Sequence, residues 1–416
     1  MSVDTATERT GTVETTLTRS RKARFALILG GLTAFGPLSV DMYLPALPAM
    51  TTGLRTDDAT LQLTLAGFIV GLAVGQLVAG PLSDAHGRRK PLLVGVGLFI
   101  VASALCALSP SAELLIVARV LQAFGAATGM VIARATVRDL FSGIAMTRFF
   151  SMLMLVTGLA PILAPVLGGQ VLTLTSWRGI FGALTVFGAL LLVVAAFALP
   201  ESLPASARRP ARVGAVARTY LGLLRDRLFL GYALACGLAF AAMFTYISGS
   251  SFVLQGVYGL TPQQYSLVFG GGALGLVLAG QVNGRIVGRF RERSLLLTGL
   301  TAGTLGSLGL LAAATLDLGL AGLLPPLFVT VSSLGLVMPN ATSLALADHP
   351  QTAGAASALL GVLQFIIGGV ASPLVGFAGE SSAVPMAAIM ASFGLLALLS
   401  YGTLARRRVA LAARLA

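Results

Sequence analysis

One carboxylate lies deep inside an apolar stretch near the start of the chain. Residues 36–48 read GPLSVDMYLPALP, and Asp41 is the only charged residue among them. An ionisable side chain inside a membrane-spanning segment is costly and is a functional candidate by default. Burial favours the protonated form of a carboxylic acid, whereas a nearby arginine favours the ionised form. An acid that alternates between these two surroundings would take up and release a proton.

A positively charged residue that could pair with Asp41, Arg119, begins the segment RVLQAFGAATG in another apolar run. Arg119, Gln122 and Gly125 follow one another at three-residue spacing, which places them on one face of a helix. We predict that Asp41 and Arg119 couple the protein's activity to protons. Two alternatives remain open: a purely structural pairing of these two residues, and an Arg119 side chain that extends outward to the membrane surface.

Neutral polar side chains in other apolar runs suit contact with a drug-sized ligand. Such pockets are mostly apolar and use a small number of polar groups to orient the ligand. Ser248 is one polar residue of this kind. The predicted substrate-binding residues are Tyr43, Gln122, Tyr246, Asn340 and Gln364.

Membrane-spanning helices must hold these residues in place. The chain has 416 residues, of which 56% are hydrophobic and 10% charged, too little polar surface for a water-soluble globule of this size. Its mean hydropathy is +0.90. Helices that rise 1.5 Å per residue need about 20 apolar residues to cross a hydrocarbon core of about 30 Å. Twelve runs meet this length: 25–48, 61–83, 91–110, 113–133, 145–170, 179–199, 228–250, 264–288, 294–316, 322–346, 354–377 and 384–404.

The basic residues are concentrated in the connections on one side of the predicted membrane spans. With the N-terminus inside, 25 of the 28 Lys and Arg residues fall in cytoplasmic segments, while Arg55 and Arg178 fall outside. Such a bias sets membrane orientation, so both termini are predicted to be cytoplasmic. The net charge of +13 is therefore a topology signal, and no nucleic-acid partner is expected. The two cysteines, Cys106 and Cys236, lie in separate runs and imply no disulfide framework, and no metal-ligand spacing is present.

The longest connection divides the runs six and six. It covers residues 201–227 and is basic. The predicted organisation is an N-tail 1–24, a first six-helix bundle 25–200, a cytoplasmic linker 201–227, a second six-helix bundle 228–404 and a C-tail 405–416.

The two bundles carry traces of an internal repeat. APVLGG, with Pro165 and Gly168, is matched in the second bundle by SPLVGF, with Pro373 and Gly376. The pair Gly75-Gln76 is likewise echoed by Gly280-Gln281. Repeats related by an axis along the membrane normal place a site at the midplane between them, which is an architecture of transporters.

The sequence context of one glycine motif argues against dinucleotide binding. GGGALG, residues 270–275, matches the dinucleotide-binding pattern G-x-G-x-x-G. That pattern requires a preceding strand, and here an apolar helix is expected instead. We predict that these glycines allow close helix packing.

The connection after the second run, GPLSDAHGRRKP, resembles the signature loop of the major facilitator superfamily. The matching residues are Gly80, Asp84, Gly87, Arg88 and Arg89. The residues themselves indicate a tight turn, with Asp84 as an acceptor for the amides that begin the next helix. The resemblance implies that Asp84 latches the two halves on the cytoplasmic side, near HPQTAG at the start of the eleventh run. It also implies that Arg119 matches a fourth-helix arginine linked to proton transfer.

A second stretch, GLAPILAPVLGG, resembles the fifth-helix signature of antiporters in that superfamily. Gly158, Pro165, Gly168 and Gly169 would give a smooth, bendable surface that moves against the other half. Ala164 departs from the pattern, since many members have glycine there. DMYLPALP, WRGIF and LPESL together resemble the bicyclomycin, chloramphenicol and florfenicol resistance subfamily over nearly the whole chain.

These observations and resemblances together predict an all-α integral membrane protein of the major facilitator fold, with twelve transmembrane helices in two six-helix bundles. We expect a proton-coupled exporter of drug-like, mainly neutral or monocationic compounds that acts as a monomer in the inner cell membrane. It would use the proton gradient and no cofactor, and its partners would be the drug, protons and membrane lipid. A proton-coupled importer of a small metabolite is the alternative. A channel lacks a filter motif, and an enzyme lacks a nucleophile-base or metal constellation.

Overall fold

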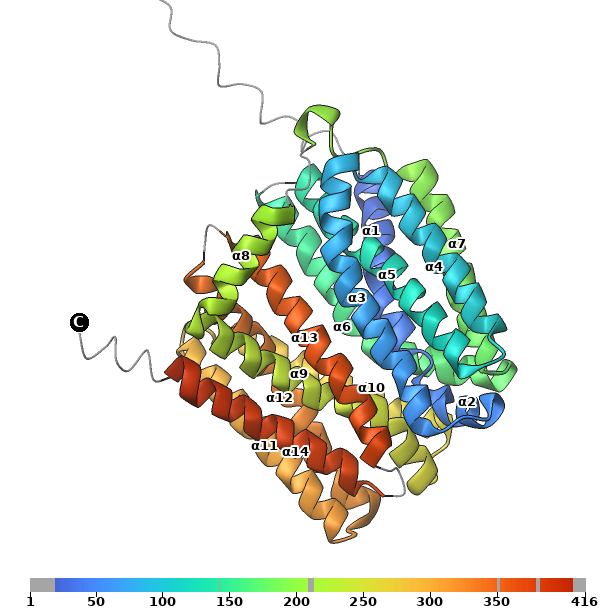
Figure 1. Ribbon diagram of the computed structural model, residues 1–416, viewed down its shortest axis with the longest axis vertical. Coiled ribbons are helices and arrows are strands. Elements are labelled where there is room, and N and C mark those ends of the chain that lie inside the picture. Colours follow the sequence, from blue (N-terminus) through green and yellow to red (C-terminus); the bar gives the residue numbers. More distant parts are fainter. Residues whose placement is uncertain (1–18, 142, 209–212, 350–351, 379–381, 407–416) are drawn as a thin grey trace, which may run out of the picture.

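The computed structural model describes residues 19–141, 143–208, 213–349, 352–378 and 382–406, and this part of the chain is helical apart from short connections (Figure 1). The helices of the first half are α1 Arg19–Asp41, η1 Leu44–Ala46, α2 Leu47–Leu54, α3 Asp58–His86, α4 Arg89–Leu108, α5 Ala112–Leu140, α6 Gly143–Leu174 and α7 Trp177–Ala198. The connection holds η2 Ala205–Ala207 and α8 Val213–Arg225. The helices of the second half are α9 Arg227–Ser251, η3 Phe252–Val257, α10 Pro262–Ile286, α11 Glu292–Thr315, α12 Gly319–Ala347, α13 Ala353–Ala378, α14 Val384–Ser400 and η5 Tyr401–Arg406.

The twelve predicted spans are confirmed, since the described residues contain 12 helices that are long and apolar enough to cross a membrane. The predicted ends fell short in places. The fourth span was expected to end at residue 133, but α5 continues to Leu140. Hydropathy drops where the sequence becomes charged, whereas the helix continues because its backbone bonds are made internally.

The connecting helix α8 was not predicted. Its segment, VGAVARTYLGLLR, is too short and too polar to be found as a span, although its apolar residues follow helical spacing. Leu223 is buried against the second half, whereas Leu221 and Arg225 are exposed. The connection between the halves is therefore partly helical, and α8 packs on α9 and α13.

The matched glycines Gly75 and Gly280 both lie where two helices of one half cross. A side chain at Gly75 of α3 would overlap Ala127 of α5. On the other pair the tight position is Gly335 of α12, where a side chain would overlap the Gly280 backbone of α10, whereas Gly280 itself has room for one.

The glycines of the dinucleotide-like motif lie inside α10, where Gly275 leaves room for Phe328 of α12. Close helix packing thus requires Gly275, whereas Gly271 has no neighbour within 4 Å of the position that a side chain would take.

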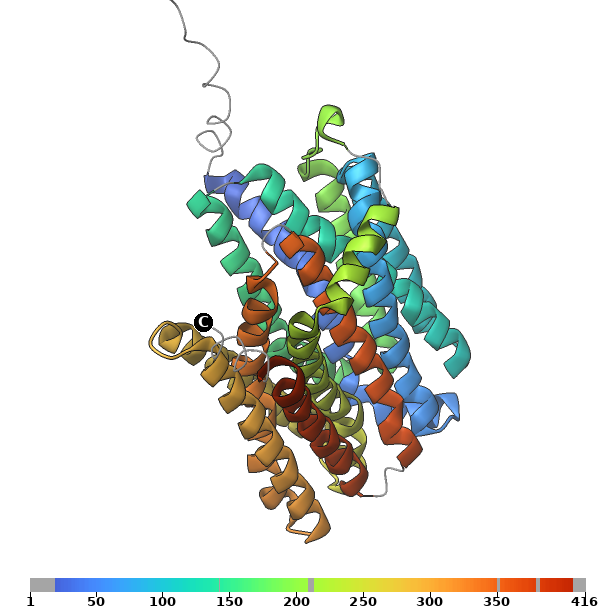
Figure 2. The ribbon, with the colours of Figure 1, turned by 60° about the vertical axis from the view of Figure 1, so that its left-hand side comes forward.

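The halves meet at one end and diverge at the other. We call the end that carries α2 the α2 end, and the end that carries α8 the linker end. Helices α3 and α13 converge toward the α2 end (Figures 1 and 2). Among described residues, the side-chain hydrogen bonds between the halves all lie at this end. One example is the bond from Ser266 Oγ to Pro165 O, 2.8 Å long. The structure is thus closed at the α2 end.

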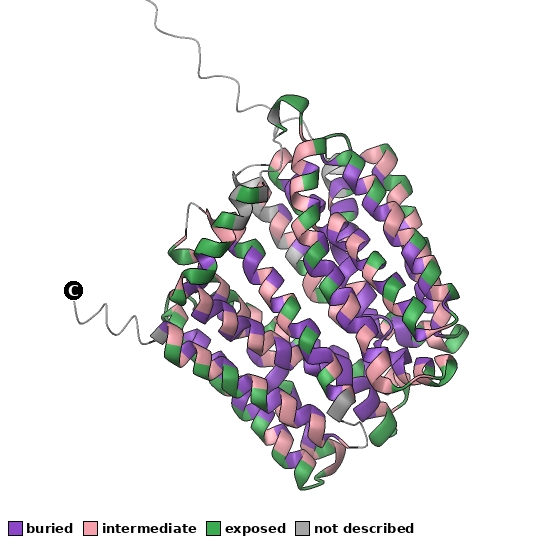
Figure 3. Cartoon of the chain, in the orientation of Figure 1, coloured by how far each residue is buried: buried purple, intermediate pink, exposed green. Residues whose placement is uncertain are grey.

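The periphery is apolar, as a lipid-facing surface requires. Exposed positions follow the outer faces of the helices, and buried positions gather where helices meet (Figure 3). Val94 and Val101 of α4 and Leu190 and Phe197 of α7 are exposed apolar side chains of this kind. Such a surface is stable only where hydrocarbon covers it.

Candidate functional site: a buried carboxylate and a caged arginine

Asp41 is the last residue of α1, at a break in the first span. Beyond it the chain makes a turn, then η1 and α2, so the span Arg24–Leu54 is discontinuous. The break has a local cause: Pro45 and Pro48 have no N–H group and cannot continue the helical bonding pattern. The sequence predicted Asp41 deep in a continuous span, and the structure places it instead at the helix end. Discontinuous helices recur at the binding sites of transporters.

The Asp41 carboxylate is buried and faces the second half. Only 5% of the residue is exposed. It lies near enough to Tyr246 and Tyr265 of the second half for a charge on Asp41 to disfavour ionisation of either tyrosine. Within the described part of the chain, no hydrogen-bond donor and no cation lies within bonding distance of it. Asp41 is thus a buried acid at the interface that has no partner to hold its charge.

Arg119 lies inside the first half, in an aromatic cage. Its guanidinium carbon is 4.5 Å from the ring centroid of Tyr43, 4.2 Å from that of Phe68 and 5.8 Å from that of Phe181. A desolvated cation over an aromatic face gains about 2 kcal/mol, which offsets part of the cost of burial. Arg119 is fully buried. Its side chain does not reach outward to the membrane surface.

The guanidinium of Arg119 retains hydrogen-bonding capacity. One Nη1–H donates to Gln122 Oε1 at 2.7 Å, and Gln122 in turn donates to Ser103 Oγ of α4 at 2.8 Å. The Nε and Nη2 groups of Arg119 are buried and have no partner among the described residues. Each unpaired buried donor costs about 1–3 kcal/mol. Arg119 is therefore equipped to receive an acceptor, and Asp41 does not fill that role in this conformation.

The predicted substrate-binding residues do not gather at one place. Tyr43 supports Arg119 and its hydroxyl group shares a 3.0 Å hydrogen bond with Thr64. Gln122 points into the first half toward Ser103. Tyr246 alone of the five lies opposite Asp41, stacked on Phe269 with ring centroids 5.3 Å apart.

The other two predicted residues are satisfied within the second half. Asn340 donates to Asn283 Oδ1 at 2.6 Å and to Leu336 O at 2.8 Å. Gln364 donates to Cys236 Sγ at 3.0 Å. The spacing of polar residues along the sequence could not show which of them turn inward to a neighbouring helix.

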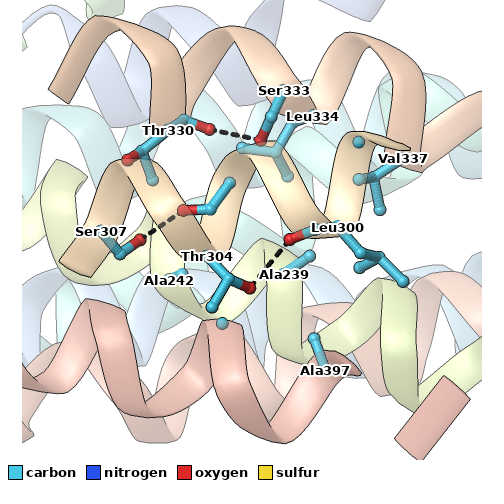
Figure 4. A pocket seen from close by; sticks show the side chains of 13 residues that line it. Ala239, Ala242, Leu300, Thr304, Ser307, Thr330, Ser333, Leu334, Val337 and Ala397 are labelled. Carbon is cyan, nitrogen blue, oxygen red and sulfur yellow. Dashed lines mark hydrogen bonds between the residues drawn. The ribbon is translucent and has the colours of Figure 1, made fainter. Parts of the chain in front are cut away.

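A small cavity lies within the second half, between α9, α11, α12 and α14 (Figure 4). Its volume of about 20 Å³ is room for about one water molecule. The hydroxyl groups on its wall, such as those of Thr304 and Ser333, donate to carbonyls of their own helices. None of the predicted substrate-binding residues lines this cavity, and it is too small for a drug.

The signature loop forms an ionic network within the first half. Arg88 is buried, donates to Asp139 Oδ2 at 2.8 Å and to Ser83 Oγ at 2.7 Å, and pairs with Asp84. Burial alone would lower the pKa of Arg88, but hydrogen bonds and charge from Asp139 and Asp84 raise it. Gly80 accepts a hydrogen bond from Ser83, and Arg89 donates to Ala196 O. The loop is thus fastened to α5 and α7.

Asp84 is not the acceptor for the amides that begin α4. That role belongs to Glu201, which accepts from Arg88 N at 2.7 Å and from Arg89 N at 3.2 Å. Asp84 is unsuited because it lies within α3, before the turn. Gly87 has φ +89°, and a side chain there would overlap the Glu201 carboxylate. Sequence reasoning missed Glu201, although it lies in the LPESL segment, because 113 residues separate it from Arg88.

The predicted latch of Asp84 to the eleventh span is not made in this conformation. Asp84 pairs with Arg88. Of the segment HPQTAG, residues 350 and 351 lie outside the described residues, and His349 contacts Asp226 at 3.0 Å. The latch stays a prediction for a conformation closed at the linker end.

The antiporter-like segment of α6 forms a contact with the second half. Pro165 O accepts from Ser266, and Gly169 O accepts from Gln263 Nε2 at 3.0 Å. Gly158 lies opposite Val277 of α10. Gly168 faces the other way, where a side chain would overlap the Met42 carbonyl. Three of the four predicted residues therefore lie where the halves touch.

Comparisons with known proteins bear on this architecture. A family model described as Major Facilitator Superfamily matches residues 29–373. The uncharacterized MFS-type transporter YdgK of Bacillus subtilis is 40% identical over 394 residues, 94% of this chain and 98% of the relative. A bicyclomycin resistance protein homolog of Haemophilus influenzae is 30% identical, covering 92% of this chain and 97% of its own. The multidrug resistance protein MdtL of Vibrio parahaemolyticus is 28% identical, covering 86% and 90%.

Solved structures agree in fold. A bacterial homolog of the human lysosomal transporter Spinster, inward-facing and occupied, aligns with a TM-score of 0.76 at 15% identity, covering 94% of this chain and 98% of its own. The xylose transporter XylE of E. coli, partially occluded and inward open, aligns with a TM-score of 0.72 at 13% identity, covering 92% and 97%. The match of the family model over most of the chain, and the 30% identical relative, confirm the resemblance predicted from the motifs. The chain belongs to the major facilitator superfamily and is a membrane transporter related to the bicyclomycin resistance proteins, not an enzyme.

Proposed function

We propose that this transporter exports drug-like compounds in exchange for protons. The observation that carries the proposal is the Asp41 carboxylate, which is buried at the interface of the halves and has no partner among the described residues. A buried carboxylate in this position favours its protonated form, and access to water or to a cation favours ionisation. A change of conformation that alternates these surroundings would bind and release one proton.

Arg119 completes the proposed coupling site. Its two unpaired donors lie in the first half, on the same side of the interface as Asp41. Approach of the Asp41 carboxylate would satisfy both donors and stabilise the ionised acid. A bidentate carboxylate–guanidinium pair is among the stronger ionic hydrogen bonds. The pair would thus exist in one state of the cycle and be broken in the state seen here.

The direction of transport is supported by the relatives. The names of two of them refer to bicyclomycin resistance and to multidrug resistance. With the linker end in the cytoplasm, as the basic loops indicate, the hydrogen bonds between the halves lie at the outer end of the molecule. An exporter would take up its substrate from the cytoplasm in a state that is closed at this outer end. The substrates we propose are neutral or monocationic lipophilic compounds similar to chloramphenicol or bicyclomycin, carried by a monomer.

A single buried carboxylate limits the number of protons exchanged per cycle, and with it the free energy that can drive export. One proton per cycle exchanged for a neutral drug moves one positive charge inward, which gains about 2.3 kcal/mol per 100 mV of membrane potential. A monocation exchanged for one proton moves no net charge and would depend on the pH gradient alone. Neutral compounds are therefore the best-driven substrates.

The test of function is a susceptibility panel in a host that lacks its own drug pumps. Expression of the chain should raise tolerance to chloramphenicol or bicyclomycin, and the Asp41→Asn variant, expressed at the same level, should not. An importer of a small metabolite on the same fold is the alternative. Unchanged drug tolerance together with uptake of a nutrient that depends on the protein would favour it.

A further inference from the structure

The chain reverses tightly between α10 and α11, in a segment, residues 285–293, that we call the basic turn. Gly288 has φ +95°, a conformation that favours glycine. The amides of Arg289 and Phe290 donate to Ile286 O at 3.0 and 3.2 Å. Because consecutive spans run in opposite directions and α9 begins beside α8, the end of α10 and the start of α11 lie at the linker end. In Figure 2 this turn, in yellow-orange, lies at the outer edge of the second half.

The basic turn carries four exposed arginines, which are Arg285, Arg289, Arg291 and Arg293. In the described part of the chain, none of their side chains makes an ion pair or a hydrogen bond. The only acid of the turn, Glu292, accepts a hydrogen bond from Ser343 Oγ of α12 at 3.2 Å. The turn thus presents an excess of positive charge to its surroundings.

The matching connection of the first half uses its arginine differently. Between α3 and α4, Arg88 is buried and pairs with Asp84 and Asp139, so its guanidinium group serves the fold. The second half has no acid at residues 284–291 that could play the part of Asp84. The arginines of the basic turn are therefore available to an anion from outside the protein.

Two apolar side chains lie among these charges. Val287 and Phe290, which are paired across the turn, are 39% and 58% exposed. On α10 they are preceded by three exposed apolar residues at four-residue spacing, Leu274, Leu278 and Val282, which share one helix face. An exposed apolar face of this kind on a membrane span is covered by hydrocarbon. Val287 and Phe290 therefore continue a lipid-covered surface.

We propose that the basic turn binds anionic phospholipid. A guanidinium group pairs with a phosphate through two parallel hydrogen bonds, and the four arginines supply the charge that attracts such a headgroup. Val287 and Phe290 contact the acyl chains, because basic side chains beside exposed apolar ones suit the boundary between headgroups and acyl chains. A free phosphate ion would leave these two side chains without an apolar neighbour. An anionic lipid satisfies both parts of the turn.

The site is tested with a fluorescent reporter in the turn. Phe290→Trp places a tryptophan there, and the signal of the chain's own tryptophan, Trp177, is measured in the parent and subtracted. The full chain is reconstituted in phosphatidylcholine vesicles that contain brominated phosphatidylglycerol or brominated phosphatidylcholine, whose bromine atoms quench a tryptophan in close contact. Brominated phosphatidylglycerol should quench the reporter at an about tenfold lower concentration, since each arginine near an anionic surface contributes about fivefold to binding.

A matched pair of variants, both carrying the reporter, separates the turn from the general positive charge of the linker end. Arg289→Gln with Arg291→Gln removes two charges of the turn and should abolish most of the preference for phosphatidylglycerol. Arg218→Gln with Arg225→Gln removes two exposed charges of α8 and should leave the preference unchanged.

Four results would overturn the proposal. Equal quenching by the two lipids would exclude an anionic lipid and favour an acidic protein segment as the occupant. Absence of quenching by either lipid would place the turn away from the bilayer. Equal losses in the two variants would assign the preference to overall charge. Recovery of the fluorescence on addition of inorganic phosphate would identify a soluble anion, and not a lipid, as the ligand.

Discussion

Within its membrane spans the first half buries two charged side chains, Asp41 and Arg119, whereas the described part of the second half fills its interior with neutral polar pairs such as Asn283–Asn340 and Gln364–Cys236. Both halves nevertheless pack a helix pair closely at a glycine, α3 on α5 at Gly75 and α10 on α12 at Gly335. Helix packing of this kind depends on small residues at the crossing. Proton coupling depends on single residues, and these residues differ between the two halves.

The comparison assigns different tasks to the halves. Among the described spans only those of the first half hold a carboxylate at depth, while the second half provides a neutral surface with Tyr246 opposite Asp41. A rocking motion needs both halves, but coupling to protons should depend on one. Matched substitutions in the two halves therefore test whether proton coupling belongs to the first half alone.

The largest effect is expected from removal of the caged cation. Arg119→Ala deletes the cation and its bond to Gln122, and it should lower proton-driven export about tenfold to hundredfold, since a charged hydrogen bond contributes about 1.5–3 kcal/mol. Arg119→Lys keeps the charge without the planar fork and should retain part of the activity. Both are measured as drug accumulation in vesicles with an imposed pH gradient.

Arg178→Ala is the matched control for Arg119. This arginine also stacks on an aromatic ring, 4.1 Å from the centroid of Trp177, but it belongs to the α2 end of the same half. It should retain most of the export. Full activity of Arg119→Ala would remove the coupling role from the aromatic cage.

A smaller effect is expected at the neutral pair of the second half. Asn340→Ala leaves the buried Asn283 carbonyl oxygen without its 2.6 Å donor and should destabilise the protein by about 1–3 kcal/mol. Transport per folded molecule should keep its dependence on the pH gradient. Thermal unfolding in detergent and vesicle transport measure the two quantities. Loss of the pH dependence at unchanged stability would mean that the second half takes part in coupling.

The smallest effect is expected at the signature loop. Partial burial opposes ionisation of Glu201, but hydrogen bonds from the amides of Arg88, Leu203 and Arg89, and the charge of Arg208, lower its pKa below the ordinary value of 4.5. A carboxyl group whose folded pKa is lowered stabilises the fold above its unfolded pKa, and this stabilisation is lost as the pH falls through the folded pKa.

Glu201→Gln should therefore cost about 1–2 kcal/mol at neutral pH. The difference from the parent should shrink as the pH falls below about 4.5. Thermal unfolding between pH 3 and pH 7 measures it. A difference that stays constant over this range would show that the loop does not depend on the ionised form.

The spans and the two buried charges could be predicted from the sequence because each leaves a local mark. A long apolar run has few alternatives in a chain of this composition, and Asp41 and Arg119 interrupt such runs. The break after Asp41 was also marked, by Pro45 and Pro48, but it was read as part of a continuous helix.

What could not be predicted depends on contacts between distant segments. Glu201 meets Arg88 across 113 residues, and Ser251 meets Leu44 across 207. Gln122 has the spacing of a residue on the Arg119 face, yet only the packing of α5 on α4 shows that it turns to Ser103. Sequence spacing identifies a helix face, but it does not identify the neighbour of that face.

The central claim, that one carboxylate of the first half couples the transporter to protons, is tested most directly by Asp41→Asn in reconstituted vesicles. Two rates are measured on the same preparation: exchange of labelled chloramphenicol for unlabelled chloramphenicol without a gradient, and accumulation driven by a pH gradient. The account predicts that the variant retains exchange, because the halves can still rock, and loses accumulation. Accumulation equal to that of the parent would contradict it.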